Sequence, residues 1–249
     1  DLAYRRSNYD AVSSDAYKIG VEYAPVEDIR FRGSFQRAVR AANIFELFST
    51  QSIGLFDLTQ GSNGIYDPCA GTTPTATAAQ CANTGVTAAQ YGSIADNPAG
   101  QFNTLTGGNP DLEPETADTY TIGFVATPSM IPGLTVSLDY FDITVEDLVG
   151  TVPQELALDT CLETGDTFFC SLVNRGNGGT LWAGQTGYIV ATNINTGSLS
   201  TSGFDLLASY ALDLDARGGI DFDYVGTMLE SLETKPLPNS TGADIFDCV

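Results

Sequence analysis

Seven segments of this chain alternate apolar and polar residues, and each is long enough to form a two-faced β-strand. In one of them, Leu134, Val136 and Leu138 are separated by Thr135 and Ser137. Because side chains along a strand point alternately to opposite faces, such a segment is apolar on one face and polar on the other. The seven predicted strands span residues 3–9, 16–24, 28–36, 117–127, 133–147, 187–213 and 219–231.

The connections between these strands alternate between short and long. The long ones span residues 37–116 and 148–186. Compact soluble domains rarely carry structureless connections of this length, whereas outer-membrane barrels combine short periplasmic turns with long extracellular loops. The short connections contain the Pro, Gly and Asp residues of tight turns and span residues 24–28, 128–133 and 215–219.

We therefore predict an all-β fold in which residues 1–249 form an antiparallel up-and-down meander, a sector of a large transmembrane β-barrel with two long extracellular loops. An odd number of strands does not close such a barrel, so we expect further strands of a larger barrel to lie outside this stretch. The side chains expected to face lipid include Tyr17, Ile19, Val21, Tyr23, Ile29, Phe31, Phe35, Tyr120, Ile122, Phe124, Ala126, Ile220, Phe222, Tyr224 and Met228.

The alternative is a secreted or cell-surface all-β domain for adhesion or carbohydrate binding. In such a domain the apolar faces would be buried between two packed sheets, and the turns would be closely spaced. Insertions as long as residues 37–116 and 148–186 fit this architecture poorly, so the pattern favours the barrel.

Charge and composition exclude several functions. The chain has 10 Lys and Arg residues against 31 Asp and Glu residues, a formal net charge of -21, and no histidine. Nucleic-acid binding needs clusters of basic residues, so no such partner is expected. No apolar run reaches the ~18 residues of a membrane-spanning helix. Without histidine, Ser-His-Asp triads and histidine-ligated zinc are excluded, and we expect no enzyme, no cofactor and no metal site.

The cysteines are grouped by loop. Cys69 and Cys81 belong to the first long loop, and Cys161 and Cys170 to the second. Such local pairs favour two disulfides formed in an oxidising compartment. A thiolate metal site is the alternative, but the C-x-x-C spacing that would support it is absent. Cys248 is left over, and we expect its partner beyond the end of the chain.

Two longer motifs resemble those of a known family. Residues 31–48, F-R-G-S-F-Q-R-A-V-R-A-A-N-I-F-E-L-F, resemble the R-G-S-x-x-R-A-x-R-A-P-N-x-x-E-L-F signature of TonB-dependent outer-membrane receptors, except that Ala42 stands where the family has proline. Residues 108–117, G-N-P-D-L-E-P-E-T-A, look like the family's G-N-P-x-L-x-P-E-x-S/A signature. Residues 134–149 and 195–206 are similar to two of its barrel strands.

The resemblance implies a barrel of about 22 strands closed by a plug, in the outer membrane of a Gram-negative bacterium. It also implies that the plug and the C-terminal strands lie outside this stretch. It implies that the protein imports a scarce, bulky substrate with energy delivered by TonB. Such substrates include ferric siderophores, cobalamin, haem and oligosaccharides. The implied partners are the TonB complex, the protein's own plug domain, outer-membrane lipid and the transported small molecule or oligosaccharide.

The candidate binding residues are arginines and the single tryptophan. Arg30 and Arg32 fall on the polar face, where we expect them to face the lumen and contact the plug. Arg37 and Arg40 complete a cationic strip that could meet an anionic substrate such as a ferric siderophore. Ion pairing with the plug or with acidic neighbours on the barrel wall is the alternative that we favour. Trp182 could stack on a sugar or a planar ligand, although anchoring at the membrane interface is favoured.

Overall fold

The computed structural model describes residues 1–8, 13–235 and 246–247, and it divides into two compact units. The predicted strand end at Tyr9 and the unpaired Cys248 lie outside the described residues. The loop unit comprises residues 43–112 and 149–194. The first range lies within the predicted loop 37–116, whereas the second runs past the end of the predicted loop at residue 186. The strand unit comprises residues 1–42, 113–148 and 195–249.

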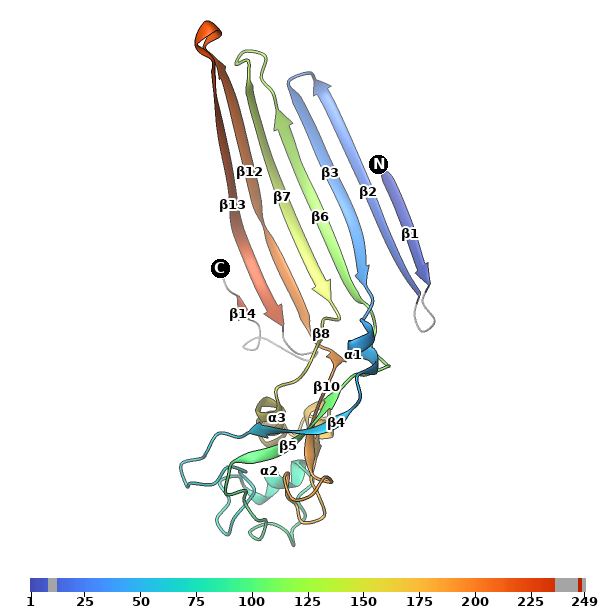
Figure 1. Cartoon of the computed structure of the whole chain (residues 1–249), viewed down its shortest axis with the longest axis vertical. Helices are drawn as coiled ribbons and strands as arrows, with labels where there is room; N and C mark the ends of the chain where they lie inside the picture. Colours follow the sequence, from blue (N-terminus) through green and yellow to red (C-terminus); the bar gives the residue numbers. More distant parts are fainter. Residues whose placement is uncertain (9–12, 236–245, 248–249) are drawn as a thin grey trace. The chain divides into compact units, whose positions relative to one another are not determined.

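The strand unit contains one antiparallel sheet in the order β1-β2-β3-β6-β7-β12-β13-β14. Figure 1 shows its long strands side by side in this order, from blue to red. Within the unit, strands that follow one another along the chain are neighbours in the sheet. The predicted up-and-down meander is therefore confirmed. The strands are β1 (Leu2–Asn8), β2 (Ser13–Val26), β3 (Ile29–Arg40), β6 (Glu115–Ala126), β7 (Leu134–Glu146), β12 (Ser198–Asp213), β13 (Gly219–Lys235) and β14 (Phe246–Asp247), with a 3-10 turn, η1 (Asp215–Arg217), between β12 and β13.

The prediction of one strand over residues 187–213 is wrong. Tyr188–Thr192 forms β10, which belongs to the sheet of the loop unit, and only β12 belongs to the long sheet. Two short strands, β8 (Val149–Gly150) and β11 (Ile194–Asn195), occur where the chain passes from one unit to the other. Alternation of apolar and polar residues continues through residues 188–192, but it does not indicate which sheet a strand joins.

The register places the predicted apolar side chains on one face of the long sheet. Phe35 is opposite Ile19 on β2 and Tyr120 on β6, and the ring centroids of Phe35 and Tyr120 are 4.5 Å apart. These side chains are uncovered, with Ile122 66% and Tyr23 65% exposed. The apolar face comprises Leu2, Tyr4, Tyr17, Ile19, Val21, Tyr23, Phe31, Phe35, Tyr120, Ile122, Phe124, Leu138, Tyr140, Phe204, Leu206, Tyr210, Ile220, Phe222, Tyr224 and Met228.

The opposite face of the sheet is polar. It carries Lys and Arg residues on β2 and β3 and carboxylates on β6, β7, β12 and β13. The polar face comprises Lys18, Glu22, Arg30, Arg32, Ser34, Arg40, Glu115, Thr121, Ser137, Asp139, Asp205, Asp221 and Asp223.

The two predicted loops are not structureless, because they fold together into the loop unit. Its four-stranded sheet has the order β4-β5-β10-β9, and β5 from the first loop pairs in parallel with β10 from the second, with Thr104 opposite Ile189. The elements are α1 (Ile44–Phe48), β4 (Ser52–Asp57), α2 (Ala78–Asn83), β5 (Gln101–Gly107), α3 (Gln154–Thr164), α4 (Thr167–Leu172), β9 (Val173–Asn174) and β10 (Tyr188–Thr192).

Local sequence and a small core explain these elements. The side chains of Asn43 and Thr77 cap the N-termini of α1 and α2. Three residues later, the side chains of Glu46 and Gln80 accept a hydrogen bond from the backbone N–H of the capping residue. The core of the loop unit contains Phe102, Leu158, Leu181 and Ile189, all fully buried. Among the described residues, no helix is both long and apolar enough to cross a membrane.

Candidate functional site

The most elaborate contact on the polar face joins Arg32 of β3 to Asp139 of β7. Arg32 Nε donates to Asp139 Oδ1 at 2.7 Å, and Nη2 donates to Oδ2 at 2.5 Å. Strand β6 runs between them, and its residue at this register is Gly123. A Cβ at Gly123 would lie 2.2 Å from Asp139 Oδ1 and 2.4 Å from the backbone oxygen of Leu138. Because Gly123 has no side chain, the Arg32 and Asp139 side chains can meet over β6 and link β3 to β7.

A serine completes this contact. Arg32 Nη2 also donates to Ser137 Oγ at 3.1 Å, and the Ser137 hydroxyl donates to Asp139 Oδ2 at 2.7 Å. Both oxygens of the carboxylate are thus used, and the bidentate geometry fixes the orientation of the guanidinium.

Two further arginines of the polar face, both on β3, also have carboxylate partners. Arg30 lies 3.8 Å from Glu22. Arg40 donates through Nε and Nη2 to the two oxygens of Glu115, each at 2.5 Å. The Arg30 pair is exposed and contributes little to stability, whereas the bidentate Arg40 pair sets the geometry where β3 ends.

Next to the Arg32 contact, the polar face is hollowed into an open groove of about 600 Å³. Its lining includes Lys18, Glu22, Arg32, Ser34 and Thr121. The hydroxyls of Ser34 and Thr121 are hydrogen-bonded to each other at 2.7 Å. The groove therefore presents hydroxyls and both signs of charge, which suits a polar partner of mixed charge.

Arg37 lies on the apolar face, because it is two residues beyond Phe35 and shares its side of β3. Its Nε donates to Asp118 Oδ1 at 2.6 Å, and its Nη2 also bonds the same carboxylate. The guanidinium carbon is 6.0 Å from the centroid of the Tyr17 ring. Arg37 thus forms a charge pair beside aromatic rings, near the end of β3 that leads into the first loop. All four arginines of this segment are thus paired with carboxylates within the sheet. Ion pairing with acidic neighbours is one of the two roles that the sequence suggested for them.

In the loop unit, the first and second loops are joined by a buried ion pair between Asp67 and Arg175. The Nη1–Oδ2 distance is 2.6 Å, the Nη2–Oδ1 distance is 3.0 Å, and both side chains are 2% exposed. Arg175 also donates to Thr84 Oγ1 and to the Gly179 carbonyl, each at 2.8 Å. Asp67 Oδ1 accepts from the Cys69 amide at 3.0 Å. Every charge here is compensated, as burial requires.

The prediction from sequence missed the Asp67–Arg175 pair. One signal was available, because Arg175 is the only basic residue of the loop unit. A single cation among many carboxylates has a strong tendency to be paired.

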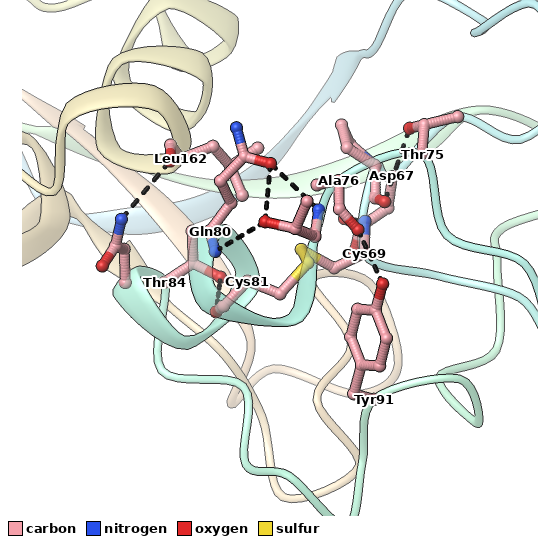
Figure 2. Close-up of a disulfide and its surroundings, with 12 residues drawn as sticks. Asp67, Cys69, Thr75, Ala76, Gln80, Cys81, Thr84, Tyr91 and Leu162 are labelled. Carbon is pink, nitrogen blue, oxygen red and sulfur yellow. Dashed lines mark hydrogen bonds between the residues drawn. A yellow bond between two sulfur atoms is a disulfide. The ribbon is translucent and has the colours of Figure 1, made fainter.

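Two disulfides join the cysteine pairs that the sequence suggested, Cys69 with Cys81 and Cys161 with Cys170. Figure 2 shows the first beside Asp67 and the start of α2. The Tyr91 hydroxyl donates to the Ala76 carbonyl at 2.9 Å in the same region. Each disulfide closes a short segment within one loop. The two loops are connected by other contacts, among them the Asp67–Arg175 pair and the β5–β10 pairing.

Trp182 belongs to the loop unit and is partly exposed. Its Nε1 donates to the Ala95 carbonyl at 3.1 Å. The indole N–H therefore already has a protein acceptor, and only the ring would be left to contact a ligand.

A row of carboxylates follows α3 at intervals of one turn. Partial desolvation, and then the charges of Glu155 and Glu163 on either side, raise the pKa of Asp159 above its ordinary value. No group of three or more metal-ligating side chains is arranged to hold an ion among the described residues.

The family model for the TonB-dependent receptor-like β-barrel matches residues 1–243. This chain belongs to that family. The resemblance carried by the strand motifs is therefore confirmed. A search of curated proteins gives no match.

Solved receptors have a similar fold. A mutant of the ferric enterobactin receptor from Pseudomonas aeruginosa, in complex with enterobactin, is 14% identical with a TM-score of 0.51, covering 91% of this chain and 24% of that chain. The siderophore receptor PirA from Acinetobacter baumannii is 15% identical with a TM-score of 0.49, covering 92% of this chain and 25% of that chain. This TonB-dependent receptor chain thus spans about a quarter of the length of the solved receptors that it matches.

Proposed function

We propose that this chain supplies part of the barrel wall and of the extracellular recognition surface of a receptor that imports a bulky substrate across the outer membrane of a Gram-negative bacterium. The observation that carries this proposal is the two-faced long sheet. Its apolar face is exposed and aromatic, whereas its polar face is ion-paired and grooved. Lipid would cover the first face, and the plug or the substrate would meet the second.

Each candidate residue has a place in this proposal. Arg30 and Arg32 face the lumen and contact the plug. Arg40 and Trp182 lie near the substrate, one on the polar face and the other in the loop unit. Arg37 and its partner Asp118 lie at the outer membrane rim, beside the ring of Tyr17. A charge pair beside an aromatic ring is suited to the interface, where one side is apolar and the other is wet.

The energy for import would come from TonB, acting through the plug. Ferric siderophores, cobalamin, haem and oligosaccharides remain the candidate substrates. The receptor from Pseudomonas aeruginosa, which is solved with enterobactin, supports a siderophore among them. Receptors of this family are transporters, so no catalytic role is proposed.

The test is to measure which side chains of β6 touch lipid. Nitroxide side chains are introduced by an unnatural amino acid, one at a time, into the full-length receptor in lipid vesicles. Collision with oxygen reports lipid contact, and collision with a water-soluble nickel chelate reports water contact. At Tyr120, Ile122 and Phe124 we expect high collision with oxygen and low collision with nickel.

The alternating positions Thr119, Thr121 and Val125 serve as matched controls, because they share the strand but face the lumen. There the ratio of oxygen to nickel collision should be lower. If Tyr120, Ile122 and Phe124 collide with neither probe, they are buried between protein layers. That result would reject the barrel and favour the adhesion or carbohydrate-binding alternative.

A further inference from the structure

Arg175, in the second loop, binds side chains that lie on both sides of the Cys69–Cys81 disulfide of the first loop. It pairs with Asp67, which precedes Cys69, and its Nε donates at 2.8 Å to the hydroxyl of Thr84, which follows Cys81. The side chains of Arg175, Asp67 and Thr84 are all buried. The contact between the loops at Arg175 therefore needs two acceptors that come from separate parts of the first loop.

Each half of the disulfide holds one of these acceptors. The Cys69 amide donates to Asp67 Oδ1 at 3.0 Å, and the Thr84 hydroxyl donates to the Cys81 carbonyl at 2.8 Å. Because the hydroxyl proton is used in this bond, the Thr84 oxygen is left to accept from Arg175. Figure 2 shows Asp67 beside Cys69 and Thr84 beside Cys81. The disulfide places the Cα atoms of the two cysteines 5.7 Å apart, so it fixes the spacing of the two acceptors.

Without the disulfide, nothing covalent closes the segment between Cys69 and Cys81, and its ends are free to separate. For cysteines 12 residues apart, ring closure favours the ordered state by about 100-fold through chain entropy. A buried guanidinium is sensitive to such separation, because its lost hydration is offset only when its partners are well placed. Arg175 is therefore expected to dock well only against the closed ring.

We infer that formation of the Cys69–Cys81 disulfide is the switch that docks the second loop onto the first at Arg175. In the switching step, the two thiols lose two electrons and two protons to a disulfide oxidant, which is reduced to two thiols. The coupling is reciprocal, because both cysteines are fully buried in the docked loops and docking keeps thiol reductants away from them. The receptor would thus complete its loop unit only in an oxidising compartment.

The first test is hydrogen exchange, followed by mass spectrometry, in the full receptor in lipid vesicles. The reporters are the amides of Gly176 and Gly179, which are hydrogen-bonded next to Arg175 and lie in the loop without this disulfide. The paired substitutions Cys69→Ala and Cys81→Ala remove the disulfide and leave no thiol. We expect them to speed exchange at the reporters at least about tenfold, within the ~100-fold that ring closure allows.

A double-mutant cycle separates positioning of the acceptors from general loosening of the unit. In the native receptor, Asp67→Asn should speed exchange at the reporters at least about tenfold. In the receptor without the disulfide it should add less than about threefold, because Asp67 is then no longer held at Arg175. Gln154→Ala is the matched control. Gln154 donates to Thr104 Oγ1 at 3.1 Å, a contact between the loops that does not involve the disulfide, so its effect should be equal in the two backgrounds.

The second test keeps the disulfide and measures the reciprocal effect. The rate at which dithiothreitol reduces Cys69–Cys81 is followed by alkylation and mass spectrometry. Arg175→Gln, a change in the other loop, should speed this reduction at least about tenfold, because the undocked cysteines become accessible. Gln154→Ala should change the rate by less than about threefold.

Three results would each overturn the inference. They are unchanged exchange at the reporters without the disulfide, equal effects of Asp67→Asn in the two backgrounds, and equal reduction rates for the native receptor and Arg175→Gln. The reduction rates decide the matter if the receptor without the disulfide does not assemble. Failure of the proposed function is a separate result, because it is read from the lipid contacts of β6, whereas this switch lies within the loop unit.

Discussion

Arg32 and Asp139 form an ion pair across a strand to which neither residue belongs. Strand β6 passes between them, and Gly123 is the residue at the crossing point. The pair therefore fixes β3 relative to β7 directly, in addition to the backbone bonds that each makes with β6. A register slip of one residue on either strand would separate the two side chains onto opposite faces.

Gly123→Ala is expected to destabilise the sheet by about 1–3 kcal/mol, because the new methyl group would meet the backbone oxygen of Leu138 as well as the Asp139 carboxylate. The measurement is the urea midpoint of the full receptor in lipid vesicles. Gly33→Ala is the matched control, since the nearest atom to its Cβ would be 3.7 Å away. Equal midpoints for the two variants would contradict a special role for Gly123.

Ile122→Lys should reduce assembly of the receptor in the membrane. A lysine on the lipid side of a barrel costs about 2–4 kcal/mol near the bilayer midplane, and Ile122 is near the middle of β6. Thr119→Lys, on the other face of the same strand, should assemble normally. The folded fraction is measured by the electrophoretic shift between heated and unheated samples. Normal assembly of both variants would be evidence against lipid on the apolar face.

Asp67→Asn is expected to destabilise the loop unit by about 3–5 kcal/mol, because Arg175 would remain charged and buried without its carboxylate. The double variant Asp67→Asn with Arg175→Gln should recover part of this loss, since no buried charge then remains. Proteolysis of the loop unit in the intact receptor provides the measurement. If the double variant is cleaved faster than Asp67→Asn, the buried-charge explanation is wrong.

Both disulfides should be found in the mature receptor. Digestion without reduction should give one linked peptide pair containing Cys69 and Cys81 and another containing Cys161 and Cys170. Each linked pair should gain two hydrogens on reduction, as measured by mass spectrometry. A linked pair that joins Cys69 to Cys161 would refute the arrangement.

The stability of the loop unit should depend on pH through Asp159. Because its pKa is raised on folding, the protonated form is favoured in the folded state. The associated stability is therefore fully present below the ordinary value of 3.8 and is lost as pH rises through the higher folded value. At neutral pH, Asp159→Asn should stabilise the unit by about 0.5 kcal/mol, the scale of like-charge pairs one helical turn apart.

This advantage of Asp159→Asn should shrink as the solution is acidified. Thermal unfolding followed by protease resistance at several pH values measures it. Asp57→Asn is a suitable control, because Asp57 is exposed and lies on β4 rather than in the carboxylate row of α3. An advantage for Asp159→Asn that does not change with pH would show that its cause is not titration.

The sequence predicted the long sheet well, because the alternation of apolar and polar residues shows directly which side chains share a face of a strand. The same rule could also have placed Arg37, since it is two positions after Phe35 on the same strand and must share its face. It could not have assigned residues 188–192, because a strand in the loop unit and a strand in the wall have the same local pattern. The partner of a strand is a property of the whole fold.

The loop unit was beyond prediction for a similar reason. Its core depends on contacts between residues far apart in sequence, such as Asp67 with Arg175. Neither residue has neighbours that form a motif, and the glycine-rich segment around Arg175 is typical of a loop. Local signals of folded structure come from the cysteine pairs, which lie close together in sequence, and from the capping residues of α1 and α2.

The parallel pairing of β5 with β10 limits how this protein can be re-engineered. Thr104 and Ile189, which face each other in that pair, are 85 residues apart. A graft that transfers only one of the two insertions into another scaffold would carry half of a sheet and one member of a buried charge pair. Both insertions therefore have to be transplanted together, and chimaeras should be designed with residues 43–112 and 149–194 as a single cassette.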